Sequence, residues 1–256
     1  MAEFRVNPAK KKLAAGGVVT LVMGDYSPEM CEFLGSLGFD AVMGEMEHFT
    51  TSWQDLNNLS RACDLWGMMS MVRINHLDPA LITRALDCGA NGIMVPQIKT
   101  ADEARLVARA SKYGPEGNRG SFGGNRRAMG VSDYHRLANE NVVVTILLED
   151  VVAIQNLPEI LEVDGIDVFW VVPGDLAQSL GYTGQTNHPE VRAVMDKAIA
   201  DIVKAGRRAG TLVNDDTIED AIAKGVSMVS VSWTNWLAAG ARGFLSKVEK
   251  AGGRSS

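Results

Sequence analysis

Eight short apolar runs of strand length alternate with segments of helical periodicity along the chain, and this alternation restricts the possible fold strongly. Strands that alternate with helices form βαβ units with a parallel sheet. Eight such units in 256 residues predict one domain, a single (β/α)8 TIM barrel over residues 1–256. An open doubly wound sheet is the alternative, but the sequence lacks a Gly-x-Gly-x-x-Gly turn after its first strand. The runs begin near Gly17, Phe39, Gly67, Asn91, Val142, Asp167, Gly210 and Val226.

The clearest predicted helix starts at Asp78-Pro79, where an Asp N-cap precedes Pro at the first helical position. An apolar stripe with helical spacing follows it. Residues 1–16 are interpreted as a polar N-terminal extension. The other helices are predicted at 28–37, 52–66, 101–112, 151–161, 189–209, 217–223 and 233–251.

Charged or imidazole side chains follow four of the apolar runs, each time at the carboxyl end. Glu47 and His48 follow one run, Arg73 closes the next, and Glu149 and Asp175 follow two later ones. An unpaired charge inside a doubly buried strand costs several kcal/mol. The repeated placement of charges at one end therefore predicts a shared polar site, at the end where barrel enzymes carry their active sites.

The overall charge and the cysteines restrict the partners and the compartment. A net charge of −6 argues against nucleic acid or an anionic membrane as a partner. No apolar run is long enough to span a bilayer, and no apolar segment follows the basic N-terminal residues as in a secretory signal. Cys31, Cys63 and Cys88 are isolated, which predicts structural thiols in a cytoplasmic protein.

Glu149 and Asp175 are the best candidate metal ligands, because two carboxylates with room for water suit Mg²⁺ or Mn²⁺. The alternative is that they cap helices or pair with arginines. Arg73 could hold a carboxylate or stabilise an enolate oxygen, or it could simply pair with Glu47 or Asp87.

His48 is a candidate general base near neutral pH. Asp87 is a candidate to fix the tautomer of His48, with an ordinary polar helix end as the alternative. Lys99 follows a central strand, so a Schiff base is a weaker candidate mechanism.

The stretch 113–134 is the longest irregular segment, and it is rich in glycine and arginine. Arg119, Arg126 and Arg127 could bind a substrate carboxylate or a neighbouring subunit. The alternative is a flexible, solvated loop.

These residues together resemble the HpcH/HpaI family of class II pyruvate aldolases. The similarity spans roughly residues 17–244. Its order and spacing are specific although no single piece decides it. The matching pieces are Gly38-Phe39-Asp40, Glu47-His48, Val72-Arg73, residues 84–90, Met94-Val95-Pro96, residues 114–120, Leu148-Glu149 and Pro173-Gly174-Asp175-Leu176.

The resemblance implies a (β/α)8 barrel in a homohexamer, a trimer of dimers that exchange the last helix, here about 233–251. It implies a divalent metal, Mg²⁺ or Mn²⁺ with Co²⁺ as a further candidate, on Glu149 and Asp175. The metal would chelate a 2-oxo acid such as pyruvate, which Gly174 and Asp175 would help to bind. Arg73 would stabilise the enolate oxygen, and His48 would move the proton of the C4 hydroxyl.

The predicted function is therefore a metal-dependent aldolase that reversibly cleaves a 4-hydroxy-2-oxo acid to pyruvate, or a close 2-oxo acid, and an aldehyde. One alternative is a related lyase or citrate-synthase-like enzyme that uses another metal-bound enolate. Another is a non-catalytic barrel that binds a 2-oxo acid. The chain departs from many relatives at Glu45, Asp150 and Val172, which leaves the substrate open.

Overall fold

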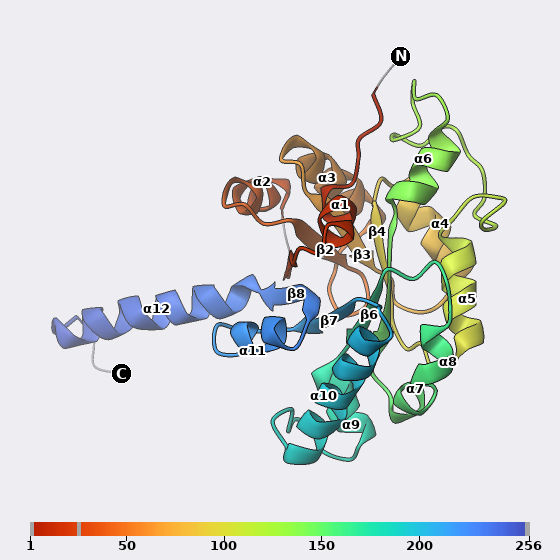
Figure 1. Ribbon diagram of the computed structural model, residues 1–256. Coiled ribbons are helices and arrows are strands. Elements are labelled where there is room, and N and C mark those ends of the chain that lie inside the picture. The colour runs from red at the N-terminus through yellow and green to blue at the C-terminus, as the bar shows by residue number, and fades with distance from the viewer. Residues whose placement is uncertain (1–2, 25–26, 254–256) are drawn as a thin grey trace.

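The structure, a computed structural model, describes residues 3–24 and 27–253. Its parallel strands follow one another around a closed barrel, and the last strand pairs with the first. The predicted (β/α)8 barrel is therefore confirmed (Figure 1). The strands are β1 (Val19–Met23), β2 (Ala41–Glu45), β3 (Met69–Arg73), β4 (Gly92–Val95), β5 (Val143–Leu148), β6 (Val168–Val171), β7 (Ala209–Leu212) and β8 (Val226–Ser232).

Most helices begin where the sequence supplies a capping side chain. Ser52 and Thr100 form capping boxes with Asp55 and Glu103, and Asp78 caps the helix that starts at Pro79. The helices are α1 (Pro8–Ala14), α2 (Pro28–Ser36), α3 (Trp53–Leu65), α4 (Pro79–Asp87), α5 (Ala101–Ala110), α6 (Tyr134–Asn141), α7 (Val151–Gln155), α8 (Leu157–Leu161), α9 (Pro173–Ser179), α10 (Pro189–Lys204), α11 (Ile218–Ala223) and α12 (Trp233–Lys250).

Two predicted helices were wrong in extent. The single helix predicted over 151–161 is split into α7 and α8 at Asn156, because Pro158 in the next turn has no N–H to continue the hydrogen-bond ladder. The helix predicted over 189–209 ends at Lys204, since Gly206 has a left-handed backbone with φ of 71° and Ala209 already begins β7.

The segment interpreted as a polar extension contains α1, which covers the amino-terminal end of the barrel. Ala9 and Leu13 are buried in the same cluster as the inward-facing residues of the strands, among them Met228 of β8. Asn7 caps α1 and donates from Nδ2 to the carbonyl oxygen of Asn91 at 2.8 Å. Residues 7–14 of the predicted extension are therefore packed onto the barrel, whereas residues 1 and 2 lie outside the described residues.

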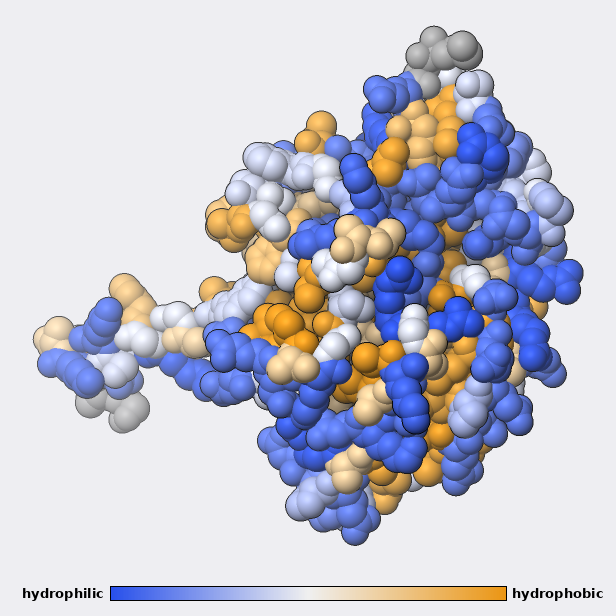
Figure 2. Space-filling model, in the orientation of Figure 1, coloured by the Kyte–Doolittle hydropathy of each residue, from blue (hydrophilic) through white to orange (hydrophobic). Residues whose placement is uncertain are grey.

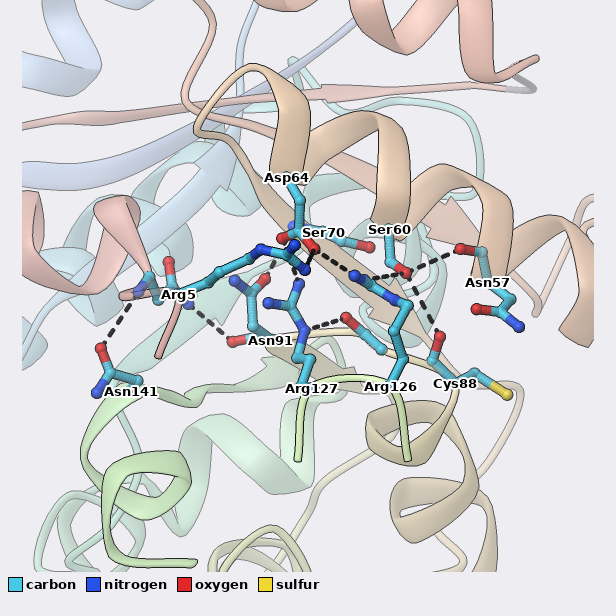
Figure 3. A network of polar contacts seen from close by, with 12 residues as sticks. Arg5, Asn57, Ser60, Asp64, Ser70, Cys88, Asn91, Arg126, Arg127 and Asn141 are labelled. Carbon is cyan, nitrogen blue, oxygen red and sulfur yellow. Dashed lines mark hydrogen bonds and ion pairs between the residues drawn. The ribbon is translucent and has the colours of Figure 1, made fainter. Parts of the chain in front are cut away.

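The irregular segment 111–133 follows α5, so it lies at the amino-terminal end of the barrel, away from the strand-end charges. Two of its arginines, Arg126 and Arg127, take part in a network of polar contacts (Figure 3). Arg126 and Arg127 contact the two carboxylate oxygens of Asp64 at 2.5 and 2.9 Å, and Arg5 contacts the same carboxylate at 3.3 Å. Arg126 and Arg127 are therefore ion-paired within the chain, at the end of the barrel opposite the strand-end charges.

Helix α12 projects from the barrel (Figure 1). None of its side chains is buried, although Leu237, Phe244 and Leu245 are apolar and more than half exposed. Apolar residues also gather at the surface where α12 leaves the barrel (Figure 2). A helix with this pattern needs a cover that its own barrel does not supply. Across residues 3–24 and 27–253, no helix has the length and apolarity required to cross a membrane.

Candidate active site

Four of the predicted site residues meet at the carboxyl end of the barrel. His48 lies just beyond β2, Arg73 ends β3, Glu149 follows β5 directly, and Asp175 lies in the first turn of α9 after β6. Two adjoining cavities open here, an outer one of about 360 Å³ and an inner one of about 210 Å³. His48 and Asp175 line both, Glu149 lines the outer cavity, and Arg73 lines the inner one.

A fully buried carboxylate, Glu45, organises one side of this site. It accepts hydrogen bonds from Nε of Arg73 and from the backbone N–H groups of Glu47 and His48, the last two at 2.7 and 3.1 Å. Charge-assisted bonds of this kind are about twice as strong as neutral ones. Glu45 therefore fixes both the turn that carries His48 and the base of the Arg73 guanidinium.

Glu149 is buried and has a strained neighbour. Its Oε1 accepts a hydrogen bond of 2.6 Å from the backbone N–H of Gln97, which has a left-handed backbone with φ of 60°. Such a backbone is unfavourable for a residue with a side chain, and it aims the N–H at the carboxylate. Burial raises the pKa of Glu149 to about 7, and the charges of Asp175 and Glu47 add to the rise.

The carboxylates fit a divalent cation. Glu47, Glu149 and Asp175 all line the outer cavity, and burial raises the pKa of Glu47 as well. Such crowded negative charge is stabilised by a hard cation with oxygen ligands, and the cavity has room for water ligands. In residues 3–24 and 27–253, no group of three or more His, Cys, Asp or Glu side chains forms a ready-made metal cage. The fit is thus to a water-rich site of the kind that Mg²⁺ prefers, rather than to a structural zinc site.

The raised pKa of Glu149 predicts a pH dependence of stability in the metal-free protein. The folded chain keeps this proton up to a pH of about 7, whereas the ordinary value is 4.5. The contribution of Glu149 to the free energy of unfolding is therefore fully present below pH 4.5, and it is lost as the pH rises toward 7, by about 3 kcal/mol. We expect the melting temperature in the presence of a chelator to fall between pH 5 and pH 8, as followed by circular dichroism.

The matched control for this measurement is Glu149→Gln, which carries no titrating group at that position. Its melting temperature should not show the part of the decline with pH that Glu149 causes. The difference between wild type and variant therefore gives the contribution of Glu149. An identical pH profile for both proteins would contradict the assignment. Saturating Mg²⁺ should also flatten the wild-type profile, because a bound cation stabilises the ionised carboxylate.

His48 is well placed to meet a ligand. Its side chain is 63% exposed, and Nε2 lies 3.7 Å from Oε2 of Glu47. It stands where the two cavities join, since it lines both. An imidazole in this position can reach a substrate in either cavity.

Comparison with known proteins identifies the family. The model of the HpcH/HpaI aldolase/citrate lyase family matches residues 20–239. The chain belongs to this family. The resemblance to this family that the sequence indicated is thus confirmed. The family is one of class II metal-dependent aldolases, which implies a divalent metal.

Three relatives illustrate the similarity. A 2-keto-3-deoxy-L-rhamnonate aldolase of Shigella sonnei is 33% identical over 90% of this chain and 88% of its own length. A 4-hydroxy-2-oxo-heptane-1,7-dioate aldolase of Shigella boydii is 34% identical over 83% and 82%. The crystal structure of an HpcH/HpaI aldolase/citrate lyase family protein from Burkholderia cenocepacia has a TM-score of 0.89 at 29% identity, and covers 95% of this chain and 99% of that one.

The relatives support the predicted enzyme class. Both sequence relatives are named as aldolases, and aldolases are carbon–carbon lyases. The citrate-synthase-like and non-catalytic alternatives are not favoured.

Asp87 does not meet His48 within this HpcH/HpaI chain. Helices of the barrel run antiparallel to the strands, so the last residue of α4 lies at the amino-terminal end, opposite the carboxyl end where His48 stands. Asp87 instead accepts a hydrogen bond of 2.6 Å from Nη2 of Arg119, which also lies over the ring of Tyr113. The prediction that Asp87 orients His48 inside one chain is corrected on this topological ground.

The other predicted residues line the site in supporting positions. Lys99 lines the outer cavity, and its Nζ lies 3.2 Å from Oδ2 of Asp150. Its side chain is half-exposed and ion-paired, unlike the desolvated lysine that Schiff-base chemistry uses. Gly174 lines the inner cavity.

Sequence reasoning missed two residues of the site. Glu45 was noticed only as a departure from relatives, although a carboxylate on the last residue of a buried strand signals a paired charge. The left-handed backbone of Gln97 has no sequence signal.

Proposed function

We propose that this chain is a class II aldolase that reversibly cleaves a 4-hydroxy-2-oxo acid to pyruvate, or a close 2-oxo acid, and an aldehyde. The observation that carries the proposal is the meeting of the buried carboxylate of Glu149 and the exposed one of Asp175 with an arginine and an exposed histidine around two adjoining cavities. The names of the relatives, a 2-keto-3-deoxy acid aldolase and a 4-hydroxy-2-oxo acid aldolase, support this substrate class.

Glu149 and Asp175 would hold the divalent metal, for which Mg²⁺, Mn²⁺ and Co²⁺ are the candidates. When bound, the metal supplies a Lewis acid for the carboxylate and oxo group of the substrate. Gly174 and Asp175 would contribute to the binding of the 2-oxo acid.

Two side chains would then act on the substrate. His48 would accept the proton of the C4 hydroxyl while the C3–C4 bond breaks. The electron pair of the C3–C4 bond would move toward C3 and the C2 oxygen. The Arg73 guanidinium, anchored by Glu45, would stabilise the negative charge that develops on that oxygen. A proton returned to C3 would complete the 2-oxo acid product.

Arg73→Lys is expected to lower kcat and kcat/KM together by about 10²–10³-fold, the range for the loss of one stabilising donor. The ammonium of lysine cannot keep the bond of Arg73 Nε to Glu45 and present a second donor to the substrate. Steady-state kinetics of aldol cleavage provide the measurement. A higher KM with unchanged kcat would mean that Arg73 only binds a carboxylate.

The same proposal includes a homohexamer built from dimers that exchange α12. The exposed apolar side chains of α12 support an exchanged position. Asp87 could then act on His48 only from a different subunit. We place the protein in the cytoplasm, acting on small molecules rather than on nucleic acid or membranes.

Replacing Leu237 and Phe244 by Glu is expected to break the assembly into smaller species. The change removes two exposed apolar side chains of α12 that would pack against the partner subunit. Size-exclusion chromatography with light scattering measures the mass. Arg242→Glu on the same exposed helix is the control, since it changes charge without removing apolar area. An unchanged mass for the double variant would contradict the exchange.

The function is tested by an assay for pyruvate release with a panel of 4-hydroxy-2-oxo acids, each with Mg²⁺, Mn²⁺ or Co²⁺. Cleavage of at least one member in a metal-dependent way is expected. Binding without turnover across the panel would favour the non-catalytic alternative. Citrate formation from oxaloacetate would favour the citrate-synthase-like one.

A further inference from the structure

The two cavities of the site differ in polarity. Every residue of the described part of the chain that lines the outer cavity is polar or charged. The inner cavity lies inside the barrel and is walled mainly by apolar side chains, among them Met23, Met43, Met94, Leu147 and Trp170. Among residues 3–24 and 27–253, only Arg73, His48 and Asp175 bring charge or an imidazole to its wall. The two halves of a substrate that spans both cavities therefore meet opposite surroundings.

The inner cavity is larger than pyruvate needs. The interior of a (β/α)8 barrel is normally filled by layers of side chains. Here about 210 Å³ is open directly beneath the charged residues. An apolar cavity of about 150 Å³ is enough to bind benzene. Pyruvate, whose only apolar group is one methyl, would leave most of this apolar space empty.

The charged residues indicate which half of the substrate faces the inner cavity. Arg73, which would stabilise the C2 oxygen, lines the inner cavity and not the outer one. Lys99 and Gln178 line only the outer cavity. Glu149 lines the outer cavity and Asp175 lines both, so a metal held by these two would lie at their junction. Because Arg73 and Gly174, which would bind the 2-oxo acid, lie on the inner wall, C3 of that acid faces the apolar side and the departing aldehyde faces the polar side.

Resting on the proposed function, we propose that the 2-oxo acid half carries an apolar substituent larger than hydrogen at C3, which occupies the inner cavity. The preferred acids are then homologues such as 2-oxobutanoate and 2-oxopentanoate rather than pyruvate. Burial of each added methylene is favourable by about 0.8 kcal/mol or more, about 4-fold or more in affinity.

The wall of the cavity suits such a group. Three of its side chains are methionines, whose flexible thioethers adapt to ligands of different shape. Trp170 occupies the space beside Gly210, where a Cβ would lie 2.3 Å from the indole ring. The indole is therefore a fixed wall, and the methionines are the adaptable part.

The test is exchange of the C3 protons in D₂O, followed by ¹H NMR with the Mg²⁺-loaded protein. The C3 proton leaves to a base in the site and a deuteron from solvent replaces it, so no aldehyde is needed. Rates per proton are compared for pyruvate, 2-oxobutanoate and 2-oxopentanoate, each divided by the buffer-catalysed rate of the same acid. We expect kcat/KM for 2-oxobutanoate to exceed that for pyruvate by about 10-fold, the usual discrimination for one methylene.

A ratio of one or less overturns the proposal while leaving the aldolase function intact. Absence of exchange with every acid, together with absence of aldol cleavage, would instead overturn the proposed function. Titration calorimetry of the same acids gives a second readout that needs no turnover, and it should rank their affinities in the same order.

Filling the cavity tests its role directly. Leu147→Phe should lower the ratio of 2-oxobutanoate to pyruvate rates by about 10-fold. Met94→Phe, on the neighbouring strand β4, is a second variant in case the first does not fold. The substrate comparison in the wild type needs neither variant. Met69→Leu is the control, because Met69 is buried inside the barrel but does not line the cavity. An unchanged ratio in both folded filling variants would overturn the assignment of this cavity.

Discussion

Glu149→Gln and Asp175→Asn are each expected to lower metal-dependent aldol cleavage by roughly 10³-fold or more, while the protein keeps its fold. Each change removes one anionic oxygen ligand, and the loss of several kcal/mol of charge stabilisation corresponds to that factor. Steady-state kinetics over a range of Mg²⁺ and Mn²⁺ concentrations measure the effect. The same variants should weaken metal binding in calorimetry.

A matched control is Asp150→Asn. Asp150 follows Glu149 directly and lines the same outer cavity, but its carboxylate caps α7 and pairs with Lys99. It should lose far less activity than Glu149→Gln. Wild-type activity that persists in a strong chelator would contradict the metal mechanism and favour Schiff-base chemistry at Lys99.

The second large effect is expected from His48→Ala, which should lower aldol cleavage by about 10²–10⁴-fold, the range for a positioned general base. The structure gives His48 an exposed ring at the junction of the two cavities. Decarboxylation of oxaloacetate, if the protein performs it, needs no proton transfer from a C4 hydroxyl and should be largely spared. Equal loss in both reactions would mean that His48 binds substrate or supports the structure.

The barrel and the four strand-end residues could be predicted because both leave local signals. An apolar run followed by Arg73 or Glu149 is visible in the sequence. Because a charge inside a buried strand is costly, the pattern indicates a polar site at the strand end. Because all strands of the closed barrel are parallel, their carboxyl ends lie at the same end of the barrel.

The rest depends on contacts that no local pattern reports. Asp87 was considered as the residue that fixes the tautomer of His48, but the sequence does not report the direction of α4, which places the two residues at opposite ends of the barrel. The three arginines around Asp64 come from segments that only the fold brings together. Likewise, α1 looks polar because only Ala9 and Leu13 face the barrel.

The position of α1 has a consequence for how the chain folds during synthesis. Ala9 and Leu13, made first, pack against the same interior as Met228 of β8, and β1 pairs with β8 along its whole length. The interior therefore cannot close until β8 has left the ribosome. Until then, a methionine-rich surface stays open to solvent, and exposed apolar surface of this kind favours association of unfinished chains. Circular permutants that open the chain elsewhere are expected to shorten or lengthen this interval.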